Sequence, residues 1–345
     1  MTTLCEGFIV GTKVLTQDGY KNIENISSND KLLTRGNINN ILRLRTSQYN
    51  GDVYNVYIKN HPNVITCTEE QQFFVREKKR LTINRNTEII FTNPKWKKAN
   101  KLTTNDYYGM MINTRKTIPE FTFDENITIK LDKNEYWYIM GHFVCDGWLD
   151  EKVGRDGRCM HEIRISIKNN EDEKEALGCI NGILPLKNIP TINKRCKVSG
   201  CSSFVWYSIF KMYGNFYEKR IPEWVHDAPI EFIREFVNGY MKGCIDEYGV
   251  TVVSYNLALG LQRLYLKIGY IFTVCKSRIT AVNGVAIPSY CLRGEENDTS
   301  FIENDYVWYE PFHISKNKAV DTSVYNFEIE NGNSYIVENK IIYNL

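Results

Sequence analysis

Residues 139–147 of the chain read IMGHFVCDG, and residues 236–245 read FVNGYMKGCI. Both stretches place apolar residues at the three- and four-residue spacing of a helix, and both carry a glycine in the middle. The first stretch reaches Asp146 near its end, and the corresponding position of the second is Cys244. This repeated pattern predicts two equivalent helices, and we expect them to organise the part of the chain around them.

Glycines set how closely these two helices can pack. Gly239 and Gly243 are four residues apart and therefore share one face of their helix. Because glycine has no Cβ atom, a second helix can approach that face, and Gly141 serves in the same way on the other helix. Ordinary packing with incidental glycines would explain one copy, but two copies at this spacing favour two helices that pack against each other through their glycines.

Length and composition exclude several classes of protein. A chain of 345 residues suggests two or three domains with sizeable cores. Its 43 Lys and Arg residues nearly balance 41 Asp and Glu residues, so net charge alone does not point to nucleic acid. No apolar run is long enough to span a membrane, and the N-terminus does not read as a signal peptide. We expect an intracellular protein, in the cytoplasm or nucleus of a host, and a viral gene is one source that this leaves open.

The ten cysteines have neither the spacing of a zinc site nor that of a redox pair. We interpret them as reduced thiols, many of them buried. Nothing in the sequence supports a metabolic enzyme or a membrane protein.

The hydrophobic pattern changes twice along the chain. From residue 7 to about 115, short alternating runs are separated by turn residues, which is typical of β-strands. Helical spacing replaces this pattern in the middle, and strands return in the last thirty residues, so the middle block is predicted to be inserted into a β domain. A similar order of elements follows each of the two helices, which predicts an internal pseudo-repeat. Predicted strands cover 12–16, 52–58, 64–68, 163–167, 324–330 and 335–343, with turns at 18–19, 50–51 and 330–333, and predicted helices cover 134–146, 230–244 and 256–268.

Basic residues gather in two regions that are candidates for contact with DNA. Isoleucines alternate with polar residues from 163 onward, which predicts a strand with one apolar and one basic face. That face would carry Arg164, Ser166 and Lys168, which are suited to reading bases or phosphates. Further candidates for phosphate contact are Lys78, Lys79, Arg80, Lys95, Lys97 and Lys98 in the β region, with Lys276 and Arg278 later in the chain. A solvated charged surface is the alternative for both regions.

The two helix stretches together resemble the paired LAGLIDADG helices of single-chain homing endonucleases of the dodecapeptide (DOD) type. Residues 218–224 (EKRIPEW) and 259–269 (LGLQRLYLKIG) are similar to stretches on either side of the second helix in that family. The resemblance implies an α/β domain of two pseudo-symmetric αββαββα-like halves. It also implies a nuclease that binds double-stranded DNA at a long asymmetric site and cuts it with Mg²⁺.

The resemblance also assigns candidate site residues. Asp146 matches the catalytic Asp of the first helix, and a carboxylate at a helix C-terminus, which meets the negative end of the helix dipole, favours a bound cation. Asp146 and Gly147 are therefore candidate metal ligands, and a plain capping role for Asp146 is the alternative. The second helix departs from the family, because Cys244, a poor Mg²⁺ ligand, holds the Asp position and Asp246 follows as a displaced substitute. We take Cys244 and Asp246 as the second pair of metal-ligand positions, Asp246 as the second catalytic candidate, and Lys197 as the candidate for the lysine that the family places near an active site.

The flanking β region has a resemblance of its own. Residues 7–16 (GFIVGTKVLT), 324–329 (VYNFEI) and 341–344 (IIYN) resemble the opening and closing blocks of an intein, or Hint, domain. The implied fold is α+β, with an all-β Hint domain interrupted by the endonuclease domain. We place the Hint parts at 1–115 and 315–345, and the endonuclease domain at 116–314 with halves of about 134–215 and 216–314. In inteins with such an insertion, the splicing domain provides an additional DNA-binding surface.

The residues that protein splicing requires are largely absent. The resemblance places Gly7 where a nucleophile should stand, Gln71 where a His should assist, and Tyr343 where the penultimate His should be. Asn344 is retained, but Leu345 follows it and cannot attack as a second nucleophile. We therefore expect splicing to be lost.

Three functions stay open from the sequence. We predict a monomeric, Mg²⁺-dependent homing endonuclease within a shell that no longer splices. The first alternative is a DNA-binding relic that cannot cut, which Cys244 favours. The second is a self-splicing or self-cleaving intein, which Asn344 favours and in which Cys5 would be a displaced nucleophile.

Overall fold

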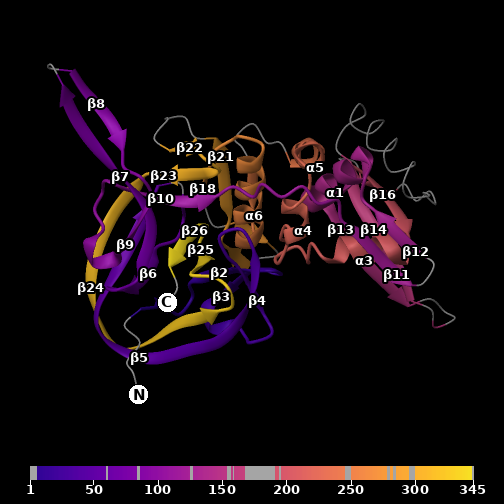
Figure 1. Cartoon of the computed structure of the whole chain (residues 1–345). Helices are drawn as coiled ribbons and strands as arrows, with labels where there is room; N and C mark the ends of the chain where they lie inside the picture. The colour runs from indigo at the N-terminus through magenta and orange to yellow at the C-terminus, as the bar shows by residue number, and fades with distance from the viewer. Residues whose placement is uncertain are drawn as a thin grey trace. The chain divides into compact units, whose positions relative to one another are not determined.

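A computed structural model describes the chain apart from residues 1–5, 60, 84–85, 125–126, 154–156, 158, 168–190, 194–195, 245–249, 278–279, 283–284, 295–299 and 344–345. Its contacts divide it into two units (Figure 1). The first comprises Met1–Asn113, Ile271–Cys275 and Gly294–Leu345, and the second comprises Thr114–Tyr270 and Lys276–Arg293. The second unit thus interrupts the first along the sequence. Its end near residue 293 differs from the expected boundary at 314, because the strand at 306–309 pairs with a strand at 106–111 in the first unit, and the strand at 301–303 pairs with the one at 306–309.

The first unit is built almost wholly from antiparallel strands (Figure 1). Among its described residues, fifteen strands join in one sheet, whose main path runs β22-β23-β10-β7-β26-β25-β2-β4-β5-β24-β1-β6. Strands from the two ends of the chain alternate along this path, so the ends fold together. The strands are β1 (Phe8–Ile9), β2 (Lys13–Thr16), β3 (Gly19–Asn22), β4 (Lys31–Leu33), β5 (Ile38–Ile58), β6 (Ile65–Thr68), β7 (Gln72–Ile83), β8 (Asn86–Phe91), β9 (Lys95–Lys98), β10 (Asp106–Met111), β22 (Phe301–Glu303), β23 (Tyr306–Tyr309), β24 (Pro311–Ile329), β25 (Ser334–Val337) and β26 (Lys340–Tyr343), with short 3-10 turns at Ile23–Asn25 and Ala99–Lys101.

Two predicted turns have different outcomes. The turn at Asp18-Gly19 is confirmed, because Asp18 lies between β2 and β3, and Gly19, the first residue of β3, has a φ of +100°. The predicted turn at Asn50-Gly51 is wrong, since β5 continues through it and pairs with β24 on both sides. The irregularity lies in β24 instead, where Asp321 takes a φ of +46° and donates its N–H to Asn50 Oδ1 at 2.9 Å.

The end of the chain forms a hairpin where the pattern predicted a single strand at 335–343. β25 and β26 pair antiparallel through Val337 and Lys340. Glu338 and Asn339 occupy the turn with φ values of +47° and +60°. Positive φ at both positions is typical of a two-residue type I′ turn, whose twist matches the right-handed twist of the two strands. Neither residue is glycine, and for that reason the turn escaped the sequence pattern.

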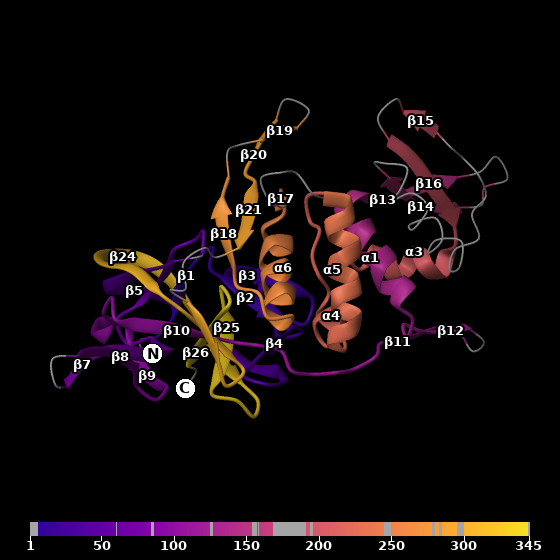
Figure 2. The ribbon, with the colours of Figure 1, turned by 90° about the horizontal axis from the view of Figure 1, so that it is seen from above.

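The second unit contains all the α-helices of the described chain (Figures 1 and 2). The three predicted helices are confirmed as α1 (Asn134–Asp146), α5 (Ile230–Cys244) and α6 (Tyr255–Lys267), and α3 (Phe204–Lys211) and α4 (Glu223–His226) join them. A four-stranded sheet has the order β13-β14-β16-β15. Its strands are β13 (Gly147–Val153), β14 (Cys159–Ile167), β15 (Thr191–Asn193) and β16 (Cys196–Ser202), and the other strands are β11 (Glu120–Asp124), β12 (Ile127–Lys130), β17 (Val250–Val252), β19 (Thr280–Val282), β20 (Val285–Ile287) and β21 (Tyr290–Gly294), with β18 (Phe272–Lys276) at the boundary of the units.

The described elements are mixed α and β, with more strands than helices, as the expected α+β class requires. They do not repeat element by element after the two long helices. The helix α1 is followed by four strands before the next described helix, α3, whereas α5 is followed by β17 alone and then by α6. No helix in the described ranges is long and apolar enough to cross a membrane.

Candidate functional site

The two long helices touch backbone to backbone at their glycines. α1 and α5 lie side by side (Figure 2). A Cβ atom built at Gly141 would overlap the carbonyl oxygen of Phe236, and one at Gly239 would overlap the carbonyl oxygen of Tyr138. Any other residue at either position would force the helices apart, so the predicted role of these glycines is confirmed.

The same close packing continues to the ends of the helices. A Cβ atom at Gly243 would lie 2.9 Å from Cys145 Sγ and 3.8 Å from Asp146 Oδ2. The helix pair therefore brings Asp146 beside the last turn of α5. Cys145 is disulfide-bonded, so the expectation of reduced thiols is wrong for this residue. Of the described cysteines, Cys67, Cys159 and Cys291 are free thiols.

Gly147 follows α1 directly, and its role there comes from close packing. Its φ is −103°, which any residue can adopt, so a left-handed cap does not require glycine here. A Cβ atom at this position would instead overlap the ring of Phe143 and lie 2.7 Å from the Phe143 carbonyl oxygen. The glycine lets the chain turn directly from α1 into β13 against that side chain.

A buried lysine from another segment closes the end of α1. Lys219 is 5% exposed, and its Nζ donates to the carbonyl oxygens of Val144 at 2.8 Å, Gly147 at 2.9 Å and Phe143 at 3.2 Å. The Cys145 carbonyl oxygen lies at 3.5 Å. The oxygens of Val144 and Cys145 are among those that a helix leaves without intrahelical partners at its C-terminus, whereas the Phe143 oxygen also accepts from the Gly147 N–H.

This lysine changes the electrostatics around Asp146. Burial lowers the pKa of Lys219 to about 8, and the charge of Asp146 opposes that shift. The last turn of α1 contains no basic residue of its own. The cation that the helix end was expected to need is therefore present in the chain, in addition to any metal.

The described residues fit a divalent metal only in part. Asp146 offers a carboxylate, and the Gly147 carbonyl oxygen, which accepts from Lys219, has a second lone pair. Neither here nor elsewhere in the described chain is a group of three or more His, Cys, Asp or Glu side chains placed to hold a metal. Mg²⁺ is commonly held by one or two carboxylates with phosphate and water oxygens, so Asp146 fits an ion shared with a phosphate. Asp246 lies outside the described residues, as do the side chains of Cys244 and Lys197.

The polar face of the β13–β14 sheet is balanced in charge. Arg164 stands opposite Trp148 in the register and contacts Glu162 at 2.6 Å and Asp150 at 3.1 Å. Lys152 also contacts Glu162, at 3.1 Å. The guanidinium of Arg164 is thus held between two carboxylates. The neighbouring candidate Ser166 is half-buried, and Lys168 lies outside the described residues.

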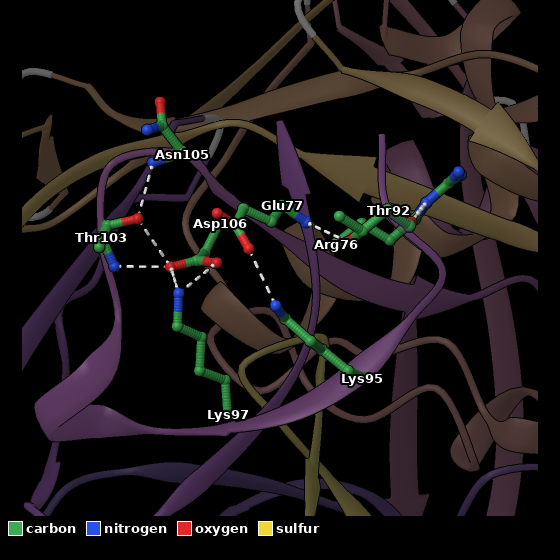
Figure 3. A network of polar contacts seen from close by, with 8 residues as sticks. All are labelled: Arg76, Glu77, Thr92, Lys95, Lys97, Thr103, Asn105 and Asp106. Carbon is green, nitrogen blue, oxygen red and sulfur yellow. Dashed lines mark hydrogen bonds and ion pairs between the residues drawn. The ribbon is translucent and has the colours of Figure 1, made fainter. Parts of the chain in front are cut away.

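Three lysines of the basic β region are engaged in ion pairs, and Figure 3 shows those of Lys95 and Lys97. Lys97 donates to both oxygens of Asp106, at 2.9 and 2.7 Å, and Asp106 is fully buried. Figure 3 also shows Thr103, whose N–H and hydroxyl donate to Asp106 at 2.6 and 2.9 Å. Lys95 contacts Glu77 at 2.9 Å, and a third pair joins Lys98 to Glu70. These three lysines have structural contacts that the sequence pattern did not reveal.

The hairpin of β7 and β8 projects from the first unit (Figure 1). Lys79 and Arg80 are exposed on it, opposite Ile90 and Ile89. Lys78 points to the Tyr107 hydroxyl at 3.4 Å. Of the later candidates, Lys276 is exposed, and Arg278 lies outside the described residues.

The residues that resemble a splicing centre are brought together. The Gly7 N–H donates to Thr68 Oγ1 at 3.0 Å, and Gln71 Nε2 donates to the Tyr343 carbonyl oxygen at 3.0 Å. Asn326 Nδ2 donates to the Glu6 carbonyl oxygen at 3.3 Å. The two ends of the first unit therefore meet at one turn.

No nucleophilic side chain fits at the first of these positions without rearrangement. A Cβ atom built at Gly7 would lie 2.8 Å from the Tyr325 carbonyl oxygen. Cys67 lies opposite Phe8 in the sheet, but its burial raises the pKa of the thiol far above its usual range. Asn344, Leu345 and Cys5 are outside the described residues.

Two residues of these sites were not identified from the sequence. Lys219 stands in the EKRIPEW stretch and Asn326 in the VYNFEI stretch, but neither was given a role. Both act on backbone carbonyl oxygens of residues far away in sequence, and no local spacing encodes such contacts. Lys219 stands between two other charged residues, Glu218 and Arg220, so nothing in its local sequence set it apart.

Neither a protein-family model nor a curated protein sequence matches the chain. Among solved structures, the chain is similar to the homing endonuclease I-DmoI. A structure of mesophilic variants of I-DmoI has a TM-score of 0.36 and 14% identity, over 46% of this chain and 88% of that chain. The complex of I-DmoI with DNA and Mn has a TM-score of 0.36 and 14% identity, over 46% and 89%. A variant of I-DmoI in complex with its target DNA and Mg has a TM-score of 0.37 and 13% identity, over 46% and 89%. These TM-scores lie below 0.5, and the likeness therefore assigns neither an activity nor a site to the chain.

Proposed function

We propose that the chain is a homing-type endonuclease that hydrolyses phosphodiester bonds of double-stranded DNA at a long asymmetric site with Mg²⁺. The observation that carries this proposal is the contact of α1 and α5 through Gly141 and Gly239, which brings Asp146 beside the end of α5. The LAGLIDADG resemblance rests on the same two stretches. A cutting carboxylate at the junction of two closely packed helices is the arrangement that the resemblance implies.

The proposed reaction is hydrolysis. Water adds to phosphorus, the bond from phosphorus to one ester oxygen breaks, and the released oxygen takes a proton from the water. Asp146 would hold the divalent ion with the Gly147 carbonyl oxygen, and the ion would supply positive charge to the phosphate. The ammonium of Lys219 keeps the end of α1 from being strongly negative where the phosphate would lie.

DNA contact is proposed for residues of both units. In the second unit, Arg164 and Ser166 on β14 would face bases or phosphates. In the first unit, the exposed Lys79 and Arg80 on the β7–β8 hairpin are better placed for phosphate contact than the paired Lys97. A two-stranded ribbon also fits the width of a major groove.

A selection from a randomised duplex library tests the proposal. The purified protein is incubated with the library in Mg²⁺ and, separately, in Ca²⁺, and bound and cleaved DNA are sequenced apart. We expect one long motif to be bound in both ions and cleaved in Mg²⁺. Absence of binding and of cleavage at low salt would contradict the whole DNA assignment.

A DNA-binding relic is the second candidate. It is favoured by the single carboxylate that the described residues offer at the end of the helix pair, and by Cys244 at the corresponding position of α5. Binding to one motif without cleavage would support it. The variant Cys244→Asp would then be expected to gain cleavage that the natural chain lacks.

We propose that the first unit is an intein-like shell that no longer splices. Gly7 offers no nucleophile, and Gln71 and Tyr343 stand where histidines would act. Intact-mass measurement after incubation checks this: the full mass should persist. Loss of Leu345 with a succinimide at Asn344 would reveal residual C-terminal cleavage instead. An intracellular location and a monomeric state remain part of the same proposal.

A further inference from the structure

Among the described residues of the second unit, Lys219 and Lys267 each donate their ammonium group to several backbone carbonyl oxygens. Lys219 contacts four carbonyl oxygens around the end of α1. Lys267, at the end of α6, donates to the carbonyl oxygens of His226 at 2.6 Å, Arg115 at 2.7 Å and Ala228 at 2.8 Å. The two lysines are chemically alike, but only Lys219 lies at the helix end that carries Asp146.

The end of α1 needs a charge that the helix itself does not supply. Helix C-termini favour cations, and an aspartate there is unfavourable unless a positive group stands nearby. The last turn of α1 has no basic residue and includes Asp146. Lys219 delivers the positive charge from a segment that follows α3, while its Nζ also lies 5.5 Å from the centre of the Phe143 ring.

The backbone of Lys219 is also held in place by a hydrogen bond. Ser254 Oγ donates to the Lys219 carbonyl oxygen at 2.6 Å. The same Ser254 hydroxyl caps α6 by accepting from the Leu257 N–H at 3.3 Å. Lys219 and Ser254 together thus link the C-terminal turn of α1 to the first turn of α6.

We propose that Lys219 is the positioning residue for Asp146: its buried ammonium fixes the last turn of α1 and keeps the Asp146 carboxylate where the proposed reaction uses it. The inference rests on the proposed function for its catalytic consequence, but the fixing of the helix end stands without it. Lys219 is 5% exposed, so it acts through α1 and not by touching DNA.

The test compares Lys219→Met with Lys267→Met in the full chain. Both variants remove an ammonium that binds backbone carbonyl oxygens, so both should lower the melting temperature. Hydrogen exchange is measured for the peptide that covers residues 140–147. We expect faster exchange there in Lys219→Met and unchanged exchange in Lys267→Met.

The same two variants are then assayed on the duplex selected by the wild-type chain. We expect Lys219→Met to keep its DNA affinity in Ca²⁺ but to lose about 100-fold in single-turnover cleavage rate, because a small displacement of a reacting group has that effect. Lys267→Met should keep both. Loss of affinity together with rate, or equal loss in both variants, would reduce Lys219 to a stabilising residue and overturn the proposal.

A milder pair of variants covers the case in which Lys219→Met does not fold. Ser254→Ala removes the anchor of Lys219, and Ser203→Ala removes a helix cap of the same kind from α3. Faster exchange over residues 140–147 in Ser254→Ala alone supports the proposal, and equal exchange in both contradicts it. If the wild-type chain cleaves no DNA, the proposed function fails while the exchange data still decide whether Lys219 fixes the helix end.

Discussion

At the scale of single residues, burial of charge is the feature with the clearest consequences. Lys97 and Asp106 illustrate it in the first unit: the carboxylate is fully buried, and the lysine is its cationic partner. Thr103 completes the set of donors to Asp106. Removing the lysine leaves a buried carboxylate without its counter-charge, which costs more than the loss of an exposed charge.

We predict that Lys97→Met lowers the free energy of unfolding by about 3 kcal/mol or more, as expected for one partner of a buried pair. Urea unfolding of the variant and of Lys79→Met measures this. Lys79 is exposed on the projecting hairpin, so its loss should leave stability nearly unchanged. Equal stability of the two variants would show that the Lys97–Asp106 pair does not hold the first unit together.

A second buried lysine makes stability depend on pH. Lys340 is fully buried beneath the Tyr309 ring, and burial lowers its pKa to about 7, against the opposing charge of Glu338. In the unfolded chain, a lysine releases its proton near pH 10.4. Between these values the unfolded state binds more protons, so the contribution of Lys340 to stability rises with pH from about 7 to about 10 and is smallest below pH 7.

The variant Lys340→Met should remove this dependence. We predict that the wild-type chain gains stability relative to Lys340→Met as the pH rises from 7 to 9.5, measured by urea unfolding at each pH. Lys31→Met, at an exposed lysine of β4, serves as the control and should follow the wild type. If the difference in free energy of unfolding between wild type and Lys340→Met stays constant across this range, the lowered pKa of Lys340 in the folded chain is contradicted.

At the scale of elements, the helix pair depends on the absence of side chains. The carbonyl oxygens of Phe236 and Tyr138 occupy the places where Cβ atoms of Gly141 and Gly239 would stand. Because backbone atoms cannot move aside as a flexible side chain does, a methyl group would have to separate the two helices.

We predict that Gly141→Ala lowers the free energy of unfolding by about 3 kcal/mol or more, the upper range for an overpacked core. The gain in helix propensity from alanine, about 1 kcal/mol, is too small to offset this loss. Asn238→Ala, on the exposed side of α5, is the matched control and should be nearly neutral. A stable Gly141→Ala variant would mean that α1 and α5 do not touch at their backbones.

The β7–β8 hairpin gives a prediction about DNA affinity. Replacing both Lys79 and Arg80 by Gln should reduce the slope of log affinity against log salt concentration by about 2, one unit for each phosphate that the variant no longer neutralises. A filter-binding titration over several salt concentrations gives the slope. An unchanged slope would show that Lys79 and Arg80 of the hairpin do not contact DNA phosphates.

Local sequence patterns predicted the helices well because their apolar residues recur at helical spacing, although α1 from Trp137 to Val144 and α6 from Leu257 to Gln262 are buried on every side. The strands were less predictable where pairing overrides local signals. Asn50-Gly51 has the composition of a turn, yet β24 pairs with β5 on both sides of it. The hairpin at Glu338 has no glycine, and only its positive φ angles reveal it.

At the scale of the whole molecule, contacts between distant segments carry what the sequence could not predict. In the first unit, Gly7 and Tyr343 are joined through Thr68 and Gln71, and β5 pairs with β24 along most of its length. The order of motifs along the chain indicated that its ends fold together. The bonds that join them depend on three-dimensional placement.

The candidate site of the second unit also depends on contacts between distant segments that the sequence did not predict. The pattern of glycines and the final Asp identified Asp146 and its helix pair. Lys219 was not identified, because its contacts are with backbone atoms that have no sequence signature of their own. Two candidate residues of the second half, Cys244 and Asp246, stay predictions from the sequence.

The decisive experiment compares the wild-type chain with Asp146→Asn on the selected duplex, with each strand labelled separately. We predict Mg²⁺-dependent hydrolysis by the wild type, together with unchanged DNA affinity and no hydrolysis in the variant. Because Asn is nearly isosteric with Asp, the helix pair should stay folded. Cleavage of either strand at the wild-type rate by Asp146→Asn would contradict the proposal that this carboxylate, at the end of the paired helices, cuts DNA.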